Sequence, residues 1–313
     1  MATLNSPLHP KALRYLAAVA QLGSVQAAAR EVSISASAID RQILMLEEDM
    51  GVPLFERLPR GMRLTAAGEL LLALSQRWKT DLNRTLSDVK QLQGVSQGQL
   101  RLAAMDSHVN GFLPGFIHRV ASEHPGIVLE VDIVSTDEAV RCLTEGAVDL
   151  AIAFNLKPQR ELHLVWTADL PLGCVAATDH ALAACQQVTF KNVAAWPLAV
   201  QSHALAIRRY LERRHSWLLQ EARPPLVTNS LQLVKSLVKS GSHVALTSEL
   251  DAGPEILDGS MCFIPLSDKN AQPQTIGVAI SAARSIPRIG RIVADLLADH
   301  VDRYLAAVRK KSA

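Results

Sequence analysis

Apolar side chains recur every three or four positions through the first fifty residues, a period that predicts helices. The first helix is expected after Pro10 and ends near Gly23, and Ser24 is a natural N-cap for a short second helix. Residues 33–35 interrupt the period before a third helix that ends at Gly51. Two short helices joined by a tight turn, the first rich in alanine, match the helix-turn-helix pattern. The predicted inward-facing residues are Leu13, Leu16, Val19, Ala20, Val25, Ala28, Ala29, Val32, Ile39, Ile43 and Leu46.

Two short apolar runs follow and flank a turn, which predicts a β-hairpin wing over residues 52–65. The turn is Pro59-Arg60-Gly61, and the hairpin carries Arg57, Arg60 and Arg63. Cationic side chains on a two-stranded wing suit contact with phosphates or with the minor groove of DNA. The less favoured alternative, for the hairpin taken alone, is an ordinary solvated surface hairpin.

A single apolar stripe then runs along residues 66–94, where Thr65 is the expected helix cap. A helix of this length extends roughly 43 Å and needs a partner to cover its stripe. That partner is either the chain's own globular domain or a second copy of the helix in a dimer. Residues 94–98 end the helix and supply a joint. The stripe consists of Leu71, Leu74, Trp78, Leu82, Leu86, Val89 and Leu92.

From residue 99 the pattern changes to short β-rich runs that alternate with helical ones. This alternation implies βαβ units and mainly parallel sheets, so we expect an α/β fold. The predicted strands are 100–105, 127–134, 149–154, 172–177, 198–201, 226–229, 244–247 and 275–281. The predicted helices are 112–123, 137–145, 204–214, 231–240 and 289–309.

Polar residues lie at the ends of several of these strands, where α/β sheets bind their ligands. Taken singly, such a residue can serve only as a helix cap, but loops gathered at one end of two sheets predict a cleft. The candidate ligand-binding residues are Ser107, Thr136, Gln201, Ser202, His203, Asn229, Ser230 and Thr247.

Composition and charge exclude several classes of function. Aromatic residues make up only 4%, which argues against stacking platforms for single-stranded nucleic acid. No run of eighteen apolar residues and no signal-peptide pattern occurs, so we expect a cytoplasmic protein without a membrane partner. Neither a nucleophile–base pattern nor metal-ligand spacing is present, which predicts no enzyme, no metal and no cofactor. The net charge of +2 neither requires nor excludes a nucleic-acid partner.

The four cysteines, Cys142, Cys174, Cys185 and Cys262, are scattered without a Cys-x-x-Cys pair. We interpret them as reduced thiols. Residues 1–65 hold seven basic against six acidic residues, a small excess for a DNA-binding domain. The acids at positions 47–49, however, lie at the far end of the third helix, so the distribution of charge favours binding more than its sum does.

Three segments, AVAQLGSVQAAAREVSIS, RQILMLEEDMGVPLFER and RGMRLTAAGE, resemble the LysR-type transcriptional regulators. In their order and spacing they match the family across residues 18–69 with only short gaps. The resemblance implies a winged helix-turn-helix domain over residues 1–65, a linker and dimerisation helix over 66–95 and an effector-binding domain over 96–313. It also implies double-stranded promoter DNA as partner, a homodimer through the linker helix that assembles into a homotetramer, and RNA polymerase as a candidate contact.

The segments LTEGAVDLAIAF, LPLGCVAATDHALA and LVKSGSHVALTSEL are similar to the effector-binding half of the same family. That half is similar to a periplasmic binding protein, with lobe I over about 99–168 and 275–308 and lobe II over about 169–274. By position, Ser107 and Thr136 match the family's ligand-contacting sites. The family commonly has Gly-x-Gly-Ile and then a proline, where this chain has residues 241–244 and Ser248. His203 and His243 are therefore either structural or adapted to a different ligand.

Oxidation-sensing members of the family use two cysteines of the second lobe. Cys174 and Cys185 lie there but flank a strand-turn segment rather than the expected helix-loop region. Redox sensing is thus the less favoured alternative to ligand sensing.

The predicted recognition helix departs from the family at Asp40, where a serine is usual, and at Ala36-Ser37, where Gln-Pro is usual. Three roles for Asp40 stay open: accepting a hydrogen bond from cytosine N4, pairing with Arg41 or a wing arginine, or being tolerated at the groove edge. The predicted DNA-binding residues are Ser35, Ala36, Ser37, Asp40, Arg41, Arg57, Arg60 and Arg63.

The leading hypothesis is a DNA-binding transcription regulator controlled by a small-molecule effector bound between two lobes. Helix N-termini and the arginines of residues 208–214 favour an anionic effector, although those arginines equally suit a solvated helix face. The alternatives are an enzyme on binding-protein-like lobes, and a DNA-binding protein whose C-terminal half serves only for oligomerisation.

Overall fold

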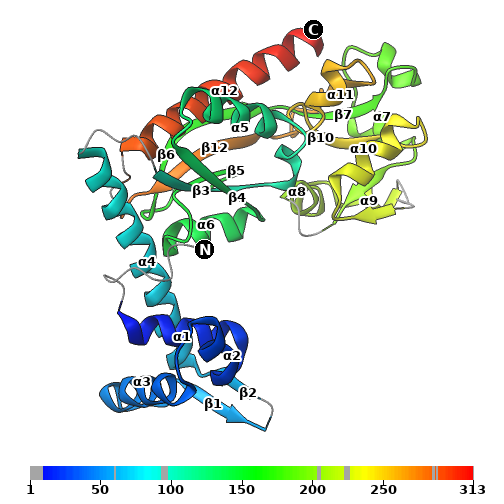
Figure 1. Cartoon of the computed structure of the whole chain (residues 1–313). Helices are drawn as coiled ribbons and strands as arrows, with labels where there is room; N and C mark the ends of the chain where they lie inside the picture. The colour runs from blue at the N-terminus through cyan, green and yellow to red at the C-terminus, as the bar shows by residue number, and fades with distance from the viewer. Residues whose placement is uncertain are drawn as a thin grey trace. The chain divides into compact units, whose positions relative to one another are not determined.

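The computed structural model describes residues 10–59, 61–92, 98–202, 206–221, 226–283, 286 and 288–312 (Figure 1). The chain divides into two compact units. The first comprises Met1–Val95 with Glu145–Ala147, and the second comprises Ser96–Thr144 and Val148–Ala313.

The first unit begins with three helices and a hairpin, as the sequence predicts. Helix α2 is capped by Ser24, whose hydroxyl accepts the amide of Ala27, and α3 is capped in the same way by Ser35. Gly51 ends α3 in the left-handed conformation (φ 67°). The elements are α1 Lys11–Leu22, α2 Val25–Glu31, α3 Ala36–Met50, β1 Phe55–Leu58 and β2 Gly61–Leu64.

The core of this unit is formed by one face of each short helix. Leu16, Val19, Ala28, Ile39 and Ile43 are buried there with Leu54, which lies just before β1. These are the apolar positions of the three-to-four-residue period, so the helix-turn-helix arrangement follows from local pattern.

Helix α4, Ala66–Leu92, continues from the hairpin. Thr65 caps it, since its hydroxyl accepts the amide of Gly68 at 3.1 Å. Leu71 packs against the core of the first unit, but Leu74, Trp78 and Val89 are 43–46% exposed. Part of the predicted stripe is therefore uncovered within the single chain.

The second unit contains a larger sheet with strand order β4-β3-β5-β12-β6. Strand β3 is parallel to β4 and β5, whereas β12 is antiparallel to β5 and β6. Figure 1 shows α5 and α12 on one face of this sheet and α6 on the other. The elements are β3 Gly98–Ala104, α5 Phe112–Glu123, β4 Ile127–Ile133, α6 Thr136–Glu145, β5 Leu150–Phe154, β6 Leu162–Leu170, β12 Gln274–Ser281 and α12 Arg288–Ser312.

A smaller sheet has the order β10-β7-β11, all antiparallel, beside a parallel pair of β8 and β9. A parallel bridge between Leu198 and Val244 links the pair to β10. The elements are β7 Leu172–Ala177, α7 Phe190–Ala194, β8 Ala199–Gln201, α8 Ala206–Arg214, α9 Ser216–Glu221, β9 Leu226–Thr228, α10 Leu231–Lys239, β10 Ala245–Ser248, α11 Gly253–Leu257 and β11 Met261–Pro265. Two short 3-10 helices are η1 Asp106–His108 and η2 Ala181–Ala184.

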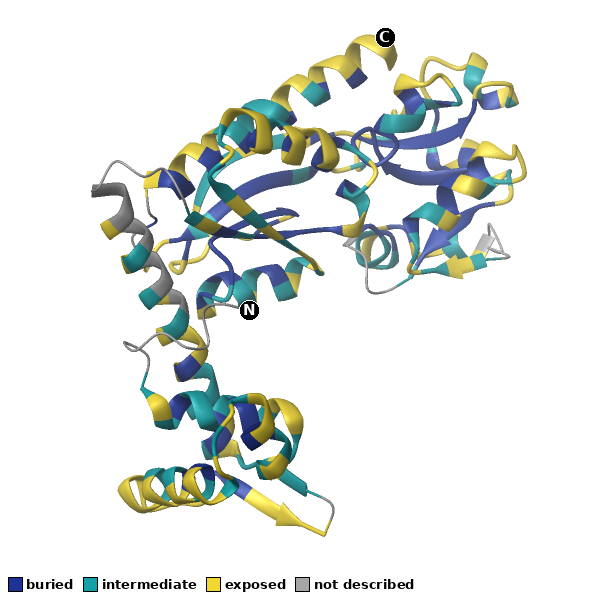
Figure 2. Cartoon of the chain, viewed as in Figure 1, coloured by how far each residue is buried: buried dark blue, intermediate teal, exposed yellow. Residues whose placement is uncertain are grey.

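The central strands of the two sheets are the buried ones, as Figure 2 shows, and every residue of β5, β7 and β10 is buried. Helix α12 contributes to two hydrophobic cores, because Leu305 packs into the core of the larger sheet and Val308 packs into a core of the smaller sheet. Among the described helices, none is long and apolar enough to cross a membrane.

The expectation of mainly parallel sheets is wrong. Strands β6 and β11 were not predicted, and both pair antiparallel with their neighbours. Helix-strand alternation predicts parallel pairing only where a helix links adjacent strands. Strand β6 instead runs directly into β7, and β12 enters the larger sheet after the chain has passed through the smaller one. Their directions are therefore set by the return path of the chain.

Candidate functional site

The predicted recognition helix presents small polar side chains to solvent. Ser35, Ser37 and Arg41 are exposed, and the hydroxyl oxygens of the two serines lie 3.2 Å apart. Ala36 is half-buried and packs partly against the core of the first unit, so only part of its methyl group faces outward. This surface is small and nearly neutral, which suits close approach to a DNA groove.

Asp40 forms an ion pair with the wing. Its Oδ1 accepts a hydrogen bond from the Arg57 guanidinium at 2.8 Å. Of the three alternatives left open by the sequence, the structure therefore contains the pairing with a wing arginine. The contact ties the first turns of α3 to β1, which aligns the recognition helix with the wing.

The wing is held at two further places. Arg63 donates twice to Glu56 across the hairpin, at 2.6 and 3.2 Å, and this carboxylate raises the pKa of the guanidinium. The Met62 amide donates to the Gly23 carbonyl at 2.8 Å, which fastens β2 to the turn after α1. Gly61 is required there, because its φ is 125° and a Cβ atom would lie 2.5 Å from the Gly23 oxygen. Arg60 lies outside the described residues.

Glu47 entered the sequence analysis only as one of three acids at the far end of the third helix, but its side chain organises this region. Its Oε1 accepts the backbone amides of Leu54 at 2.7 Å and Phe55 at 3.2 Å. The acid at the end of α3 thus holds the entry to the wing. No local pattern signals such a contact, since the partners are seven and eight residues away.

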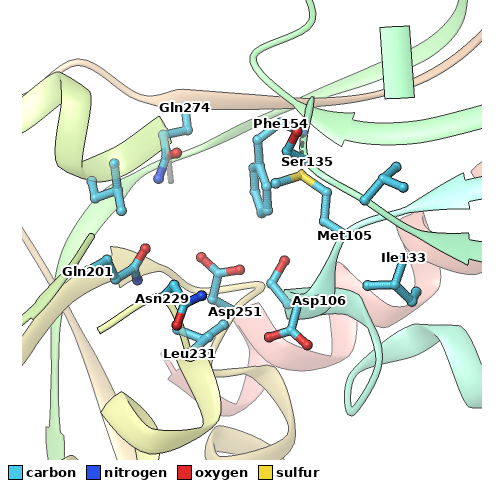
Figure 3. Close-up of a pocket in the computed structure, with 13 residues that line it drawn as sticks. Met105, Asp106, Ile133, Ser135, Phe154, Gln201, Asn229, Leu231, Asp251 and Gln274 are labelled. Atoms are coloured by element: carbon cyan, nitrogen blue, oxygen red, sulfur yellow. Dashed lines mark hydrogen bonds between the residues drawn. The ribbon is translucent and has the colours of Figure 1, made fainter. Parts of the chain in front are cut away.

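The second unit contains a cavity of about 250 Å³ between the larger sheet and the smaller strands. Figure 3 shows polar side chains from both sides directed into it. Its apolar wall consists of Met105, Ile133, Val134, Phe154, Ile207 and Leu231. Its polar lining consists of Asp106, Ser107, Ser135, Gln201, Asn229, Asp251 and Gln274.

Three of the predicted ligand-binding residues, Ser107, Gln201 and Asn229, line this cavity. They come from η1, from the end of β8 and from the loop after β9, so loops at strand ends do converge here. Gln201 is almost fully buried, whereas Asn229 is exposed at the cavity's edge. His203 lies outside the described residues.

Four other predicted residues do not line the cavity, and three have evident structural roles. The Thr136 hydroxyl donates to the Phe154 carbonyl at 3.2 Å, and Thr136 lines a second hollow that is described below. Ser230 caps α10 by accepting the amide of Leu233. Thr247 is buried and donates to Asp251 at 2.5 Å. The fourth, Ser202, donates its backbone amide to the Thr228 carbonyl.

The sequence did not identify Ser135, Gln274 or Asp251 as lining residues. Ser135 precedes the predicted Thr136, and the direction of the chain at the start of α6 decides which hydroxyl faces the cavity. Gln274 begins β12, and its side-chain oxygen accepts a hydrogen bond from Asn155 at 3.4 Å. Asp251 lies between β10 and α11, where no periodic pattern indicates a ligand-binding position.

A second, more open hollow of about 710 Å³ lies beside the cavity and shares Phe154 with it. Its charged lining comprises Lys157, Arg209, Arg213, Arg214 and Asp137. Arg209 pairs with Asp137 at 3.1 Å, which joins α8 to the start of α6.

The remaining predictions concern histidines, metals and cysteines. His243 contacts the Ser242 hydroxyl at 2.8 Å and does not line the cavity. The described residues contain no cluster of side chains that suits a metal ion. Cys174 is buried on β7, where desolvation raises the pKa of its thiol to about 12, while Cys185 is exposed. A thiol with so high a pKa reacts slowly with oxidants.

A winged helix-turn-helix unit followed by a two-sheet α/β unit defines a class of transcription regulators. The sequence model described as "Bacterial regulatory helix-turn-helix protein, lysR family" matches residues 10–69. The one described as "LysR substrate binding domain" matches residues 93–302. The chain therefore belongs to the LysR family of transcriptional regulators.

Individual relatives agree with this assignment. A probable nitrogen assimilation transcriptional activator of Synechococcus elongatus is 32% identical over 232 residues, covering 73% of this chain and 74% of the relative. Full-length CbnR in complex with its target DNA has a TM-score of 0.63 at 19% identity, over 96% of this chain and 99% of that one. A full-length OxyR variant from Pseudomonas aeruginosa has a TM-score of 0.65 at 20% identity, over 95% and 94%. The similar sequences are transcriptional regulators and not enzymes.

Proposed function

We propose that this regulator is controlled by a small molecule that occupies the 250 Å³ cavity of its second unit. The cavity supports this function because its lining comes from both sheets, so an occupant contacts both. We further propose that these sheets belong to two lobes, 99–168 with 275–308 and 169–274. An effector that prefers one arrangement of the lobes shifts the population toward it, and DNA binding changes with that shift.

The effector is proposed to carry an acidic group. The described lining of the cavity contains no lysine or arginine, so support for this group comes from the neighbouring hollow. Lys157, Arg213 and Arg214 are exposed there without an ion-pair partner among the described residues. Guanidinium groups bind carboxylate and phosphate strongly, so an effector that extends past Phe154 can place its acidic end among them.

DNA binding is proposed to use α3 and the wing, through Ser35, Ala36, Ser37, Asp40, Arg41, Arg57, Arg60 and Arg63. The exposed Leu74, Trp78 and Val89 of α4 support a homodimer through this helix, and a homotetramer is the proposed full assembly. Two copies then present two recognition helices to a two-fold related site. At a promoter in the cytoplasm, the bound regulator is expected to act on RNA polymerase.

Genome-wide mapping of bound sites tests the DNA-binding part of this proposal. We expect reproducible sites with two related half-sites, and the absence of any such site would contradict the proposal. The genes beside the sites indicate which small acids to try as effectors.

Filling the cavity tests the effector part. Asn229→Trp places a bulky ring at the cavity, whereas Val227→Trp places it on an exposed position of β9 that does not line the cavity. We expect small acids to change promoter binding of the wild type and of Val227→Trp but not of Asn229→Trp, measured by fluorescence anisotropy. An Asn229→Trp protein that still responds would rule out this cavity.

The acidic group is tested with Lys157→Gln against Arg160→Gln. Both residues are exposed on the same loop, but only Lys157 lines the basic hollow. The effector concentration needed for half of the response should rise only for Lys157→Gln. Equal responses of the two variants would refute a role for this hollow.

A further inference from the structure

The cavity of the second unit is lined by the buried carboxyl group of Asp251, to which the proposed function assigns no role. Asp251 is only 7% exposed, and Figure 3 shows its carboxyl group directed into the cavity. Its Oδ2 accepts hydrogen bonds from Thr247 at 2.5 Å and from Ser248 at 3.0 Å. Its Oδ1 is buried without a hydrogen-bond partner among the described residues. A buried acceptor of this kind normally has a partner.

The carboxyl group is built into its position by this chain's own sequence. Ser248 both donates to Oδ2 and accepts the backbone amide of Asp251, at 3.4 Å. Two hydroxyl groups therefore orient one carboxyl oxygen, while the other is buried without a hydrogen-bond partner, near the Ser107 hydroxyl, which is also unpartnered among the described residues.

The charge of the cavity lining also favours a ligand that donates hydrogen bonds. Asp106 is a second acid of the cavity, and no lysine, arginine or histidine is among its described lining residues. The other polar groups include the amides of Gln201, Asn229 and Gln274, whose oxygens also accept hydrogen bonds. The polar lining of the cavity therefore offers acceptors and two carboxyl groups.

The electrostatics of the carboxyl group favour a cationic partner. Burial raises the pKa of Asp251. The neighbouring hydroxyl groups of Thr247, Ser248 and Ser107 oppose that rise only in part. A cation that donates to Oδ1 offsets the cost of burying the charge and forms a charge-assisted hydrogen bond, about twice as strong as a neutral one.

We propose that the inner end of the effector is a protonated amine that donates to Oδ1 of Asp251. This inference rests on the proposed function, since it names the chemistry of the same cavity. Together with the acidic end in the basic hollow, it describes a small amphoteric molecule. A volume of about 250 Å³ accommodates on the order of eight to ten non-hydrogen atoms.

Matched sets of small molecules test for the amine directly, whichever effector the regulator uses. Each set keeps its acidic groups unchanged and changes one substituent from ammonium to hydroxyl to hydrogen. The sets are aspartate, malate and succinate; γ-aminobutyrate, γ-hydroxybutyrate and butyrate; and phosphoethanolamine, ethylene glycol phosphate and ethyl phosphate. Affinity is measured on the full chain by titration calorimetry, with thermal unfolding as a second readout.

In at least one set, the wild type should bind the amine at least about tenfold more tightly than the hydrogen counterpart. Asp251→Asn keeps the size of the side chain and removes its charge, so the advantage of the amine should fall below about threefold. Asp258→Asn is the matched control, because Asp258 is an exposed acid at the end of α11 that does not line the cavity. It should keep the full advantage. The wild-type comparison stands even if Asp251→Asn folds poorly.

The inference is overturned if, in every set, the hydroxyl or hydrogen member binds as tightly as the amine, or if no amine binds at all. It is also overturned if the advantage of the amine survives Asp251→Asn. None of these overturns the proposed function. That fails only if promoter binding responds to no small molecule or if Asn229→Trp responds like the wild type.

Discussion

Replacing Asp40 by serine releases Arg57 and is expected to alter DNA binding far more than stability. In the ion pair the Arg57 side chain is 59% exposed and that of Asp40 is 36% exposed. Pairs this accessible to water contribute about 0.2–1 kcal/mol. We therefore expect the free energy of unfolding of Asp40→Ser to fall by no more than about 1 kcal/mol, which leaves the chain folded.

The effect on DNA is larger because the released guanidinium can neutralise one more phosphate. Each added phosphate contact steepens the dependence of log affinity on log salt by about 0.9. For each chain, a fourfold change in salt concentration should therefore change the DNA affinity of Asp40→Ser by about 3.5-fold more than that of the wild type. Fluorescence anisotropy on one promoter duplex across a salt series measures the slope, and selection from a randomised DNA library measures the preferred site.

The control is Asp49→Ser, which removes the same charge from the exposed C-terminal end of α3, where no ion pair forms among the described residues. It should leave the slope unchanged. If Asp40→Ser has the slope and the preferred site of the wild type, the reasoning is refuted. A change at one base pair with an unchanged slope would instead show that Asp40 contacts a base.

Three further predictions concern other parts of the chain. Trp78→Glu should weaken the dimer in sedimentation experiments, because Trp78 belongs to the exposed apolar stripe of α4. The neighbouring change Arg77→Glu should leave the dimer intact. Equal assembly of the two variants would contradict dimerisation through this helix. Burial lowers the pKa of His108 to about 3, so the unfolded chain takes up a proton at a higher pH than the folded chain does. The free energy of unfolding should therefore fall as the pH decreases from about 6.5 toward 3, by up to about 1.4 kcal/mol per pH unit. Urea unfolding at several pH values checks this, and His108→Phe should flatten the dependence. Cys185 should react with a thiol reagent well before Cys174, whose pKa is about 12, and simultaneous labelling in the native state would disprove the burial argument.

Local signals in the sequence were sufficient for the first unit. Ser24, Ser35 and Gly51 act as caps within three residues of their partners, and the buried side chains of α1–α3 follow the helical period. Such features depend on neighbours along the chain, so a sequence pattern contains them. The alternation of strands and helices similarly predicted the α/β class of the second unit.

Contacts between distant residues depended on the tertiary structure. Asp40 and Arg57 are 17 positions apart, and their pairing was only one of three open alternatives. The antiparallel β6, β11 and β12 follow from the path of the chain between two sheets, which helix-strand alternation does not describe.

The cavity shows most clearly which features the sequence predicts and which depend on the tertiary structure. Strand ends predicted Ser107, Gln201 and Asn229, because ligands bind where strands of an α/β sheet end. The choice of Ser135 over Thr136 depends on the direction of one turn, and Asp251 becomes a cavity residue only when its loop folds beside η1. The sequence by itself determined the family, the helix-turn-helix and the strand ends. Only the packing of segments far apart in the chain decided which carboxyl groups line the cavity, because burial and charge at one point are sums over all the segments that surround it.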